Sequence, residues 1–161
     1  MQATPARLVA ITAALVLLAL PAVVFADPDG TATVRFGRSD IGSPFDPRSG
    51  HDQSAHAKDS LFPRTVTIAR GGSVTYLRDG FHQVAIYEPD TRPEDIAVTR
   101  LDRGLIDDPE DRVARGPRPQ EGWTTWTTPS GTFDERGRYL VICTVPGHFT
   151  NFDMYGWVNV K

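Results

Sequence analysis

The sequence contains very little sulfur. Its 161 residues include one cysteine, Cys143, and two methionines, of which one is the initiator and the other is Met154. A single cysteine excludes a disulfide within the chain, and a lone thiol in an oxidising compartment reacts unless it pairs with another chain or binds a metal. The formal net charge is −3, so the chain lacks the basic excess typical of a nucleic-acid-binding protein.

The first 26 residues predict export. Arg7 precedes an apolar run that begins at Leu8 and ends in small and apolar residues at Ala26. A positive start, an apolar middle and a small residue at the end are typical of a secretory signal peptide. The alternative is an uncleaved membrane anchor, because the run approaches the ~18–20 residues that span a bilayer. We expect residues 27–161 to form one exported domain.

The remaining sequence predicts an all-β protein. Short runs rich in Val, Ile, Thr, Tyr and Trp are separated by turn residues, which is typical of a β-sandwich or barrel and not of alternating βαβ units. One of these runs contains two strands joined at Gly71-Gly72. The predicted strand regions are residues 31–37, 64–80, 83–88, 122–128, 137–143 and 155–161.

Two segments do not fit the strand pattern. Residues 39–63 are rich in Pro, Gly, Ser and Asp, which predicts a long surface loop. Residues 91–121 form a polar insertion whose first part we expect to be a short helix. The helix prediction rests on Pro93, Glu94 and Asp95 as a first turn and on the spacing of Val98, Leu101 and Leu105.

The segment "CTVPGHFTNFDM" places three metal-binding residue types within twelve positions: Cys143, His148 and Met154. A copper electron-transfer site uses one thiolate and two imidazoles in a plane, with a weak thioether as the axial ligand. We expect Pro146-Gly147 to form the turn that brings this segment back toward the ion. The second imidazole is predicted to be His82, which follows a glycine turn at the start of a strand in "LRDGFHQVAIYE".

The sequence resembles the cupredoxins, the small type 1 blue copper proteins that include plastocyanin and azurin. The resemblance lies in "TVTIARGGSVTYLRDGFHQVAIYEPD" and "GTFDERGRYLVICTVPGHFTNFDMYGWVNVK". It implies an eight-stranded Greek-key β-sandwich that binds one mononuclear copper ion through His82, Cys143, His148 and an axial Met154. Two features depart from the family pattern: five residues separate His148 from Met154, where two to four are commoner, and Gln83 stands where many relatives have Asn.

The resemblance also implies the function. We expect an exported blue copper protein that shuttles single electrons between redox proteins, such as a cytochrome or an oxidase, through short-lived contacts. The edge of His148 would serve as the electron port, under an apolar cover of Phe81, Pro146, Phe149 and Phe152. No nucleophile with a positioned base and no phosphate-binding glycine loop are apparent, so we do not expect an enzyme.

Other interpretations remain open from the sequence. Cys143 and Met154 are also residue types that fill protein cores. Zinc is less suited than copper, because structural zinc sites use four nitrogen or sulfur donors and a thioether is a poor one. The rival functions are a copper carrier, which would need an open and exchangeable site, and a metal-free interaction module with the same fold.

Overall fold

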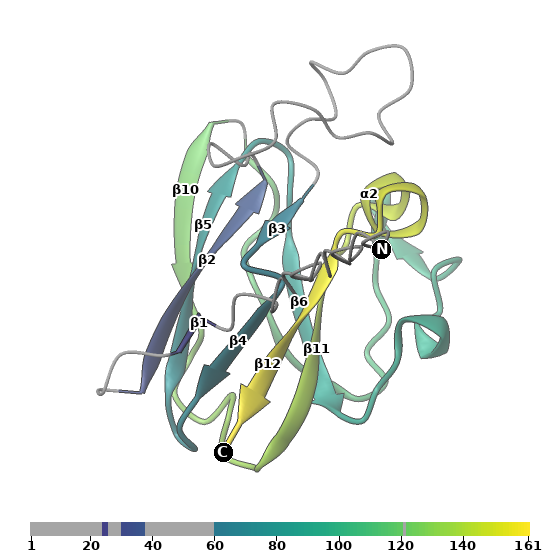
Figure 1. Cartoon of the computed structure of the whole chain (residues 1–161). Coiled ribbons are helices and arrows are strands. Elements are labelled where there is room, and N and C mark those ends of the chain that lie inside the picture. The colour runs from purple at the N-terminus through teal and green to yellow at the C-terminus, as the bar shows by residue number, and fades with distance from the viewer. Residues whose placement is uncertain (1–23, 26–29, 38–59, 121) are drawn as a thin grey trace, which may run out of the picture.

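The computed structural model describes residues 24–25, 30–37, 60–120 and 122–161 (Figure 1). The predicted leader lies outside the described residues except for Val24 and Phe25, and of the predicted loop 39–63 only the last four residues are described. Within the described part of the chain, no helix has the length and hydropathy needed to cross a membrane.

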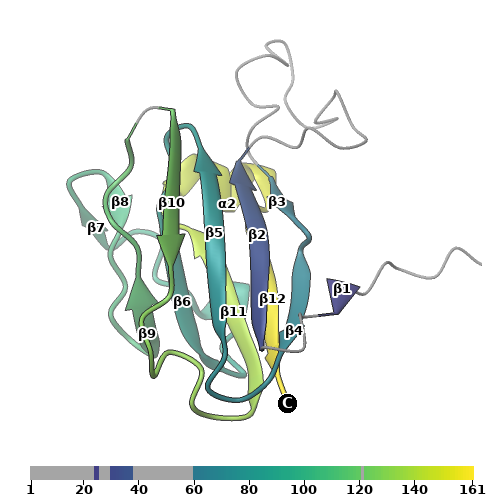
Figure 2. The same ribbon diagram turned by 90° about the vertical axis from the view of Figure 1, so that its left-hand side faces the viewer.

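Two β-sheets pack face to face, as predicted for a β-sandwich. Figure 2 shows one sheet in front of the other. The first has six strands in the order β1 (Val24–Phe25), β4 (Thr65–Ile68), β12 (Tyr155–Val160), β11 (Gly137–Cys143), β6 (Val84–Pro89) and β9 (Arg112–Arg115). The second has four in the order β10 (Trp123–Thr127), β5 (Ser73–Asp79), β2 (Thr31–Gly37) and β3 (Leu61–Phe62). The two sheets exceed the eight strands implied by the resemblance because β1 and β9 extend the six-stranded sheet at its two edges.

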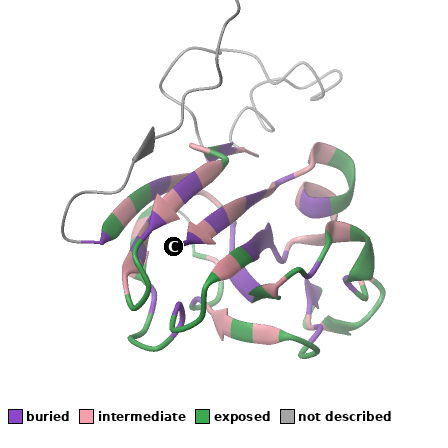
Figure 3. Cartoon of the chain, turned by 60° about the horizontal axis from the view of Figure 1, so that its bottom comes forward, coloured by how far each residue is buried: buried purple, intermediate pink, exposed green. Residues whose placement is uncertain are grey.

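The main core lies between the two sheets. Buried residues alternate with less buried ones along most of β2, β5 and β12, so every second side chain faces the opposite sheet (Figure 3). The side chains in this core include Phe36, Tyr76, Val141 and Val158. Cys143 and Met154 belong to the same core, which places both sulfur atoms inside the sandwich.

A second core covers the outer face of the six-stranded sheet. The central strands β6 and β11 contain runs of buried residues without alternation, as expected for strands that are covered on both faces. Ile96 and Ile106 of the insertion pack on this outer face, together with Phe149 of the helix α2 (Pro146–Phe152). The insertion is therefore a layer of the fold and not only a surface loop.

The two strands joined at Gly71-Gly72 belong to different sheets. β4 lies in the six-stranded sheet and β5 in the four-stranded sheet, so this connection crosses from one layer of the sandwich to the other. The crossing requires a close backbone approach, because a Cβ atom on Gly72 would collide with the carbonyl oxygens of Gly30 and Ala69. The glycine pair that resembles a hairpin turn in the sequence is thus a corner of the sandwich.

The predicted helix in the insertion is wrong beyond its first turn. Pro93–Asp95 form a single 3-10 turn, η1, and the next residues lead into a hairpin of β7 (Leu101–Asp102) and β8 (Leu105–Ile106). Arg103 and Gly104 have φ angles of 50° and 79°, a conformation that favours a two-residue hairpin turn and ends a helix. Similarly, the predicted loop 39–63 ends in a short strand, β3, which pairs with β2.

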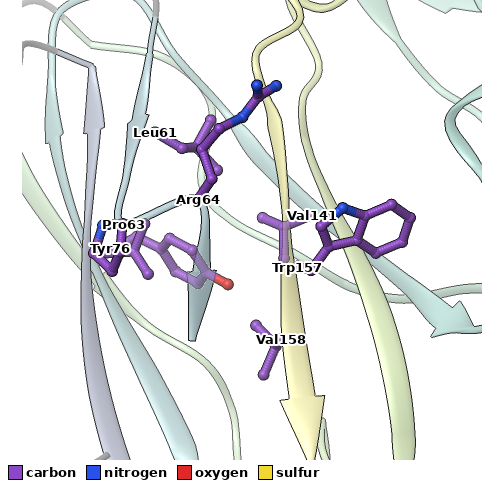
Figure 4. A pocket seen from close by; sticks show the side chains of 8 residues that line it. Leu61, Pro63, Arg64, Tyr76, Val141, Trp157 and Val158 are labelled. Atoms are coloured by element: carbon purple, nitrogen blue, oxygen red, sulfur yellow. The ribbon is translucent and has the colours of Figure 1, made fainter. Parts of the chain in front are cut away.

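A small pocket opens beside the main core, and none of the predicted metal ligands lines it. Figure 4 shows the Tyr76 ring pointing from β5 toward β12 among the side chains that line it. The lining residues are Val34, Leu61, Pro63, Arg64, Tyr76, Val141, Trp157 and Val158. The hydroxyl of Tyr76 is buried and has no hydrogen-bond partner among the described residues.

We expect the substitution Tyr76→Phe to stabilise the protein. The ring would keep its T-shaped contact with Phe36 and its stacking on Trp126, while the unpaired hydroxyl would be removed. Leaving a buried polar group unpaired costs about 1–3 kcal/mol, so the free energy of unfolding should rise by about 1 kcal/mol. Urea denaturation of the two proteins measures this change, and a loss of stability in Tyr76→Phe would contradict it.

Candidate metal centre

Three of the four predicted ligands converge at one end of the sandwich. His82 lies in the connection from β5 to β6, Cys143 is the last residue of β11, and His148 lies in α2. The Cys143 Sγ atom is 3.7 Å from the Nδ1 atom of each histidine, and the two Nδ1 atoms are 3.1 Å apart. In the described residues, these three side chains form the only group of His, Cys, Asp or Glu that is placed to hold a metal ion.

The spacing of these donor atoms fits one metal ion. A first-row ion lies about 2.0 Å from an imidazole nitrogen and about 2.3 Å from a thiolate sulfur, taking the values for zinc. With these bond lengths, the measured separations correspond to angles of about 119° between sulfur and each nitrogen and about 100° between the nitrogens. The two sulfur–ion–nitrogen angles are close to the trigonal value, so a single ion can contact all three atoms without a rearrangement of the chain.

The chemistry of the donor set favours copper. One thiolate with two imidazoles, arranged near a plane, is the set found in type 1 copper sites. Cys143 is fully buried and His82 is 1% exposed, whereas His148 is only partly buried. The sulfur is therefore shielded from solvent, and His148 is the most exposed of the three residues.

The segment between Cys143 and Met154 contains a helix where the sequence predicted only a turn. Pro146 begins α2, because its fixed φ angle and missing N–H suit the first position of a helix. The helix ends at Phe152, and the cap residue Asp153 has the left-handed φ angle of 49°. The five residues between His148 and Met154, an unusually long spacing for the family, are thus taken up by helix and cap.

Backbone hydrogen bonds tie Met154 to both neighbouring ligands. The Met154 N–H donates to the His148 carbonyl at 3.0 Å, closing the helix, and the Met154 carbonyl accepts from the Cys143 N–H at 2.9 Å. The Met154 side chain is fully buried in the main core that also contains Cys143. This position is consistent with an axial thioether, which stays a prediction.

The predicted apolar cover is only partly as expected. The Phe152 ring lies near His148, with ring centroids 6.5 Å apart, and Phe81 is 55% exposed. Phe149, in contrast, packs in the second core against Tyr155, on the outer face of the six-stranded sheet. Its inclusion in the cover was wrong, because helical spacing turns residues 148 and 149 to different faces of α2.

His82 is fixed by its neighbours on β2 and in its own turn. Its N–H donates to the Gly80 carbonyl at 3.0 Å, and its ring makes an edge contact with Phe36 at a centroid distance of 6.1 Å. Gly37 lies against the same ring, since a Cβ atom at that position would be 3.1 Å from His82 Cδ2. The end of β2 therefore forms one wall of the site.

Gln83 links the two ligand-bearing segments, a role that sequence reasoning missed. Its side-chain oxygen accepts a hydrogen bond from the Thr144 hydroxyl at 2.9 Å, and its main-chain carbonyl accepts from the Thr144 N–H at 2.9 Å. Gln83 follows His82, and Thr144 follows Cys143, so these bonds fix the spacing of two ligands. The sequence did contain a signal for this role, because Gln83 stands at a position where many cupredoxins have Asn.

No family model and no curated protein match the sequence. Solved structures do. Reduced auracyanin from the photosynthetic bacterium Roseiflexus castenholzii is 17% identical, with a TM-score of 0.53 over 82% of this chain and 97% of its own. Rusticyanin from Thiobacillus ferrooxidans is 24% identical, with a TM-score of 0.50 over 86% of this chain and 82% of its own.

These similarities show that the chain has the cupredoxin fold. The resemblance inferred from the sequence and the predicted β-sandwich are both confirmed. The arrangement of His82, Cys143 and His148 also fits a cupredoxin centre.

Proposed function

We propose that this protein is an exported type 1 copper protein that carries one electron at a time between redox partners. The observation that supports this most directly is the convergence of His82 Nδ1, His148 Nδ1 and Cys143 Sγ within 4.8 Å of one another. Three residues separated by up to 66 positions meet in a geometry that one ion can occupy. Packing alone does not require a thiol and two ring nitrogens to face one another.

The protein would contribute rigidity and exclusion of water. Copper, when bound, supplies the one-electron couple between Cu(II) and Cu(I). Cys143, His82 and His148 would hold the ion, and the Met154 thioether would be a fourth, weaker ligand. These residues are fixed at strand ends, by the backbone hydrogen bonds of Met154 and by the link between Gln83 and Thr144. The ligand positions should therefore change little between oxidation states. A small change lowers the structural cost of each transfer.

The partly exposed His148 ring would be the point of electron entry and exit. Its partners would be redox proteins, such as a cytochrome or an oxidase, held in small interfaces that separate quickly. We propose electron transfer and not substrate turnover, and a location outside the cytoplasm, reached through the predicted N-terminal leader. A retained leader would attach the protein to the membrane.

The test is spectroscopic. The purified protein, after addition of one equivalent of Cu(II), should show an intense visible band from the thiolate and narrow copper hyperfine splitting in its electron paramagnetic resonance spectrum. Dithionite should bleach the band with one electron per chain, and an oxidant should restore it. A colourless protein with a titratable thiol would instead indicate a metal-free module. Rapid copper exchange without the band would indicate a carrier.

Replacing Met154 with Leu should test its axial role. The substitution conserves volume, so the fold should change in stability by less than about 1.5 kcal/mol. Because the thioether is a weak ligand that tunes the potential, the visible band should persist while the reduction potential changes. Protein-film voltammetry measures the potential, and an unchanged value would show that Met154 only fills the core.

A further inference from the structure

We propose that the insertion, residues 91–121, is part of the frame of the metal centre, and that Arg115 is a positioning residue that acts through Gln83. The inference rests on the proposed function, because it concerns how this chain holds its copper ligands. The insertion has no counterpart in the pattern by which the sequence resembles the cupredoxins. Its described residues contact both ligand-bearing segments.

On the cysteine side, the contact runs through strand β8. The Ile106 N–H donates to the Thr144 carbonyl at 2.7 Å. Thr144 is fully buried and directly follows Cys143. The Ile106 side chain is also fully buried, in the second core against β11, so this contact is held on two sides.

On the histidine side, the contacts come from the end of β9. The Gly116 N–H donates to the Val84 carbonyl at 2.9 Å, and the Gly116 carbonyl accepts from the Gln83 side-chain amide at 2.8 Å. The Arg78 guanidinium, 2% exposed, donates from one nitrogen to the carbonyls of both Pro117 and His82. Residues 116–117 are thereby joined to the peptide that carries the first histidine.

The guanidinium group of Arg115 forms hydrogen bonds on both the cysteine side and the histidine side. Its Nε atom donates to the Gln83 side-chain oxygen at 3.0 Å, and that oxygen also accepts the Thr144 hydroxyl. Its Nη2 atom donates to the Ile106 carbonyl at 3.4 Å, and its Nη1 atom donates to the Asp107 carboxylate at 2.7 Å. Hydrogen bonds from a charged donor are stronger than neutral ones, so Arg115 should hold the Gln83 amide in one orientation.

A second arginine in the same strand provides a matched control. Arg112 donates to the same oxygen of Asp107 at 2.8 Å, and its side chain is 19% exposed, against 20% for Arg115. The hydrogen bond from Arg112 is the main reason why the pKa of Asp107 is lowered, and Arg115 adds to it. Arg112 therefore shares the charge, the strand and the carboxylate partner of Arg115, but makes no hydrogen bond to Gln83.

Loss of Arg115 should loosen the bond between Gln83 and Thr144, and with it the spacing of His82 and Cys143. A hydrogen bond to a charged group contributes about 1.5–3 kcal/mol, which corresponds to about tenfold or more in a local opening equilibrium. The effect should be present before any metal binds, because every contact is made by the protein alone.

The experiment compares Arg115→Met, Arg112→Met and Arg115→Lys in the whole chain. In the metal-free proteins, hydrogen exchange at the Thr144 amide, which donates to the Gln83 carbonyl, and the reaction rate of the Cys143 thiol with a disulfide reagent are measured. We expect exchange and thiol reaction to be about tenfold faster in Arg115→Met and within about twofold of the native rates in Arg112→Met. Arg115→Lys retains the charge but lacks the Nε–H donor, so it should resemble Arg115→Met.

The same variants are then loaded with Cu(II). We expect the copper hyperfine splitting and the reduction potential to change in Arg115→Met and not in Arg112→Met. Equal behaviour of these two variants would overturn the positioning role, and so would native behaviour of Arg115→Lys in all four measurements. A native protein that gives no thiolate band would instead reject the proposed function, and the metal-free measurements would still decide whether the insertion braces these residues.

Discussion

Cys143→Ser should abolish the visible absorption of the copper-loaded protein. The band would arise from covalency between thiolate and copper, and a serine hydroxyl stays protonated and cannot replace it. Because loss of residues around a metal site already reduces affinity by about 10–100-fold, loss of the thiolate itself should reduce Cu(II) affinity by more than about 100-fold. Absorption spectroscopy and competition with a chelator measure the two effects.

The fold should survive this substitution. Cys143 is fully buried at the end of β11, and serine has nearly the same shape. Burial of its hydroxyl should lower the free energy of unfolding by only about 1–3 kcal/mol, which thermal denaturation of the metal-free protein measures. Met154→Leu is the matched comparison, since it alters the other sulfur residue and should keep the band. A band of native intensity in Cys143→Ser would show that the Cys143 thiolate is not a copper ligand.

Gly37→Ala should both destabilise the protein and disturb the metal centre. Gly37 ends β2 with a φ angle of 124°, a conformation that L-residues with a side chain rarely adopt. An added Cβ atom would collide with the Asp79 carbonyl oxygen and lie 3.1 Å from the His82 ring. Strain of this kind costs about 1–3 kcal/mol, so with the backbone collision we expect a loss of about 3 kcal/mol or more in the free energy of unfolding.

Gly71→Ala is a control that separates the loss of stability expected for Gly37→Ala from the disturbance of the metal centre. Gly71 also has a positive φ angle, 77°, but an added Cβ atom there would have no neighbour within 4 Å. We expect Gly71→Ala to cost about 1–2 kcal/mol and to leave the copper spectrum unchanged. Urea denaturation and electron paramagnetic resonance of both variants test this. A native spectrum in Gly37→Ala would show that the end of β2 does not position His82.

The candidate ligands and most strands could be recognised in the sequence because their signals are local. The strand β2 has the predicted limits of residues 31–37, since alternating apolar residues are a short-range pattern. The candidates Cys143, His148 and Met154 lie within twelve residues, and their types alone suggest a soft metal ion. His82 was the candidate for the second imidazole because it follows a glycine turn at the start of a strand, and the resemblance to the cupredoxins supported that choice.

The insertion shows the limit of such signals. Val98, Leu101 and Leu105 have helical spacing, but the left-handed turn at Arg103 and Gly104 makes a hairpin instead. Local spacing does not report that Ile106 packs on the outer face of the six-stranded sheet. The continuous apolar runs of β6 and β11 contained that information, because strands without alternation are covered on both faces.

The sequence by itself determined which residues are candidates for a metal centre and the class of fold that carries them. Only the tertiary structure decided what holds the centre in place. The bonds of Gln83 reach Thr144, Arg115 and Gly116, which are 32 to 61 residues away along the chain. Periodicity and spacing describe neighbours in the sequence, whereas these partners meet only because two sheets and an inserted hairpin pack against one another.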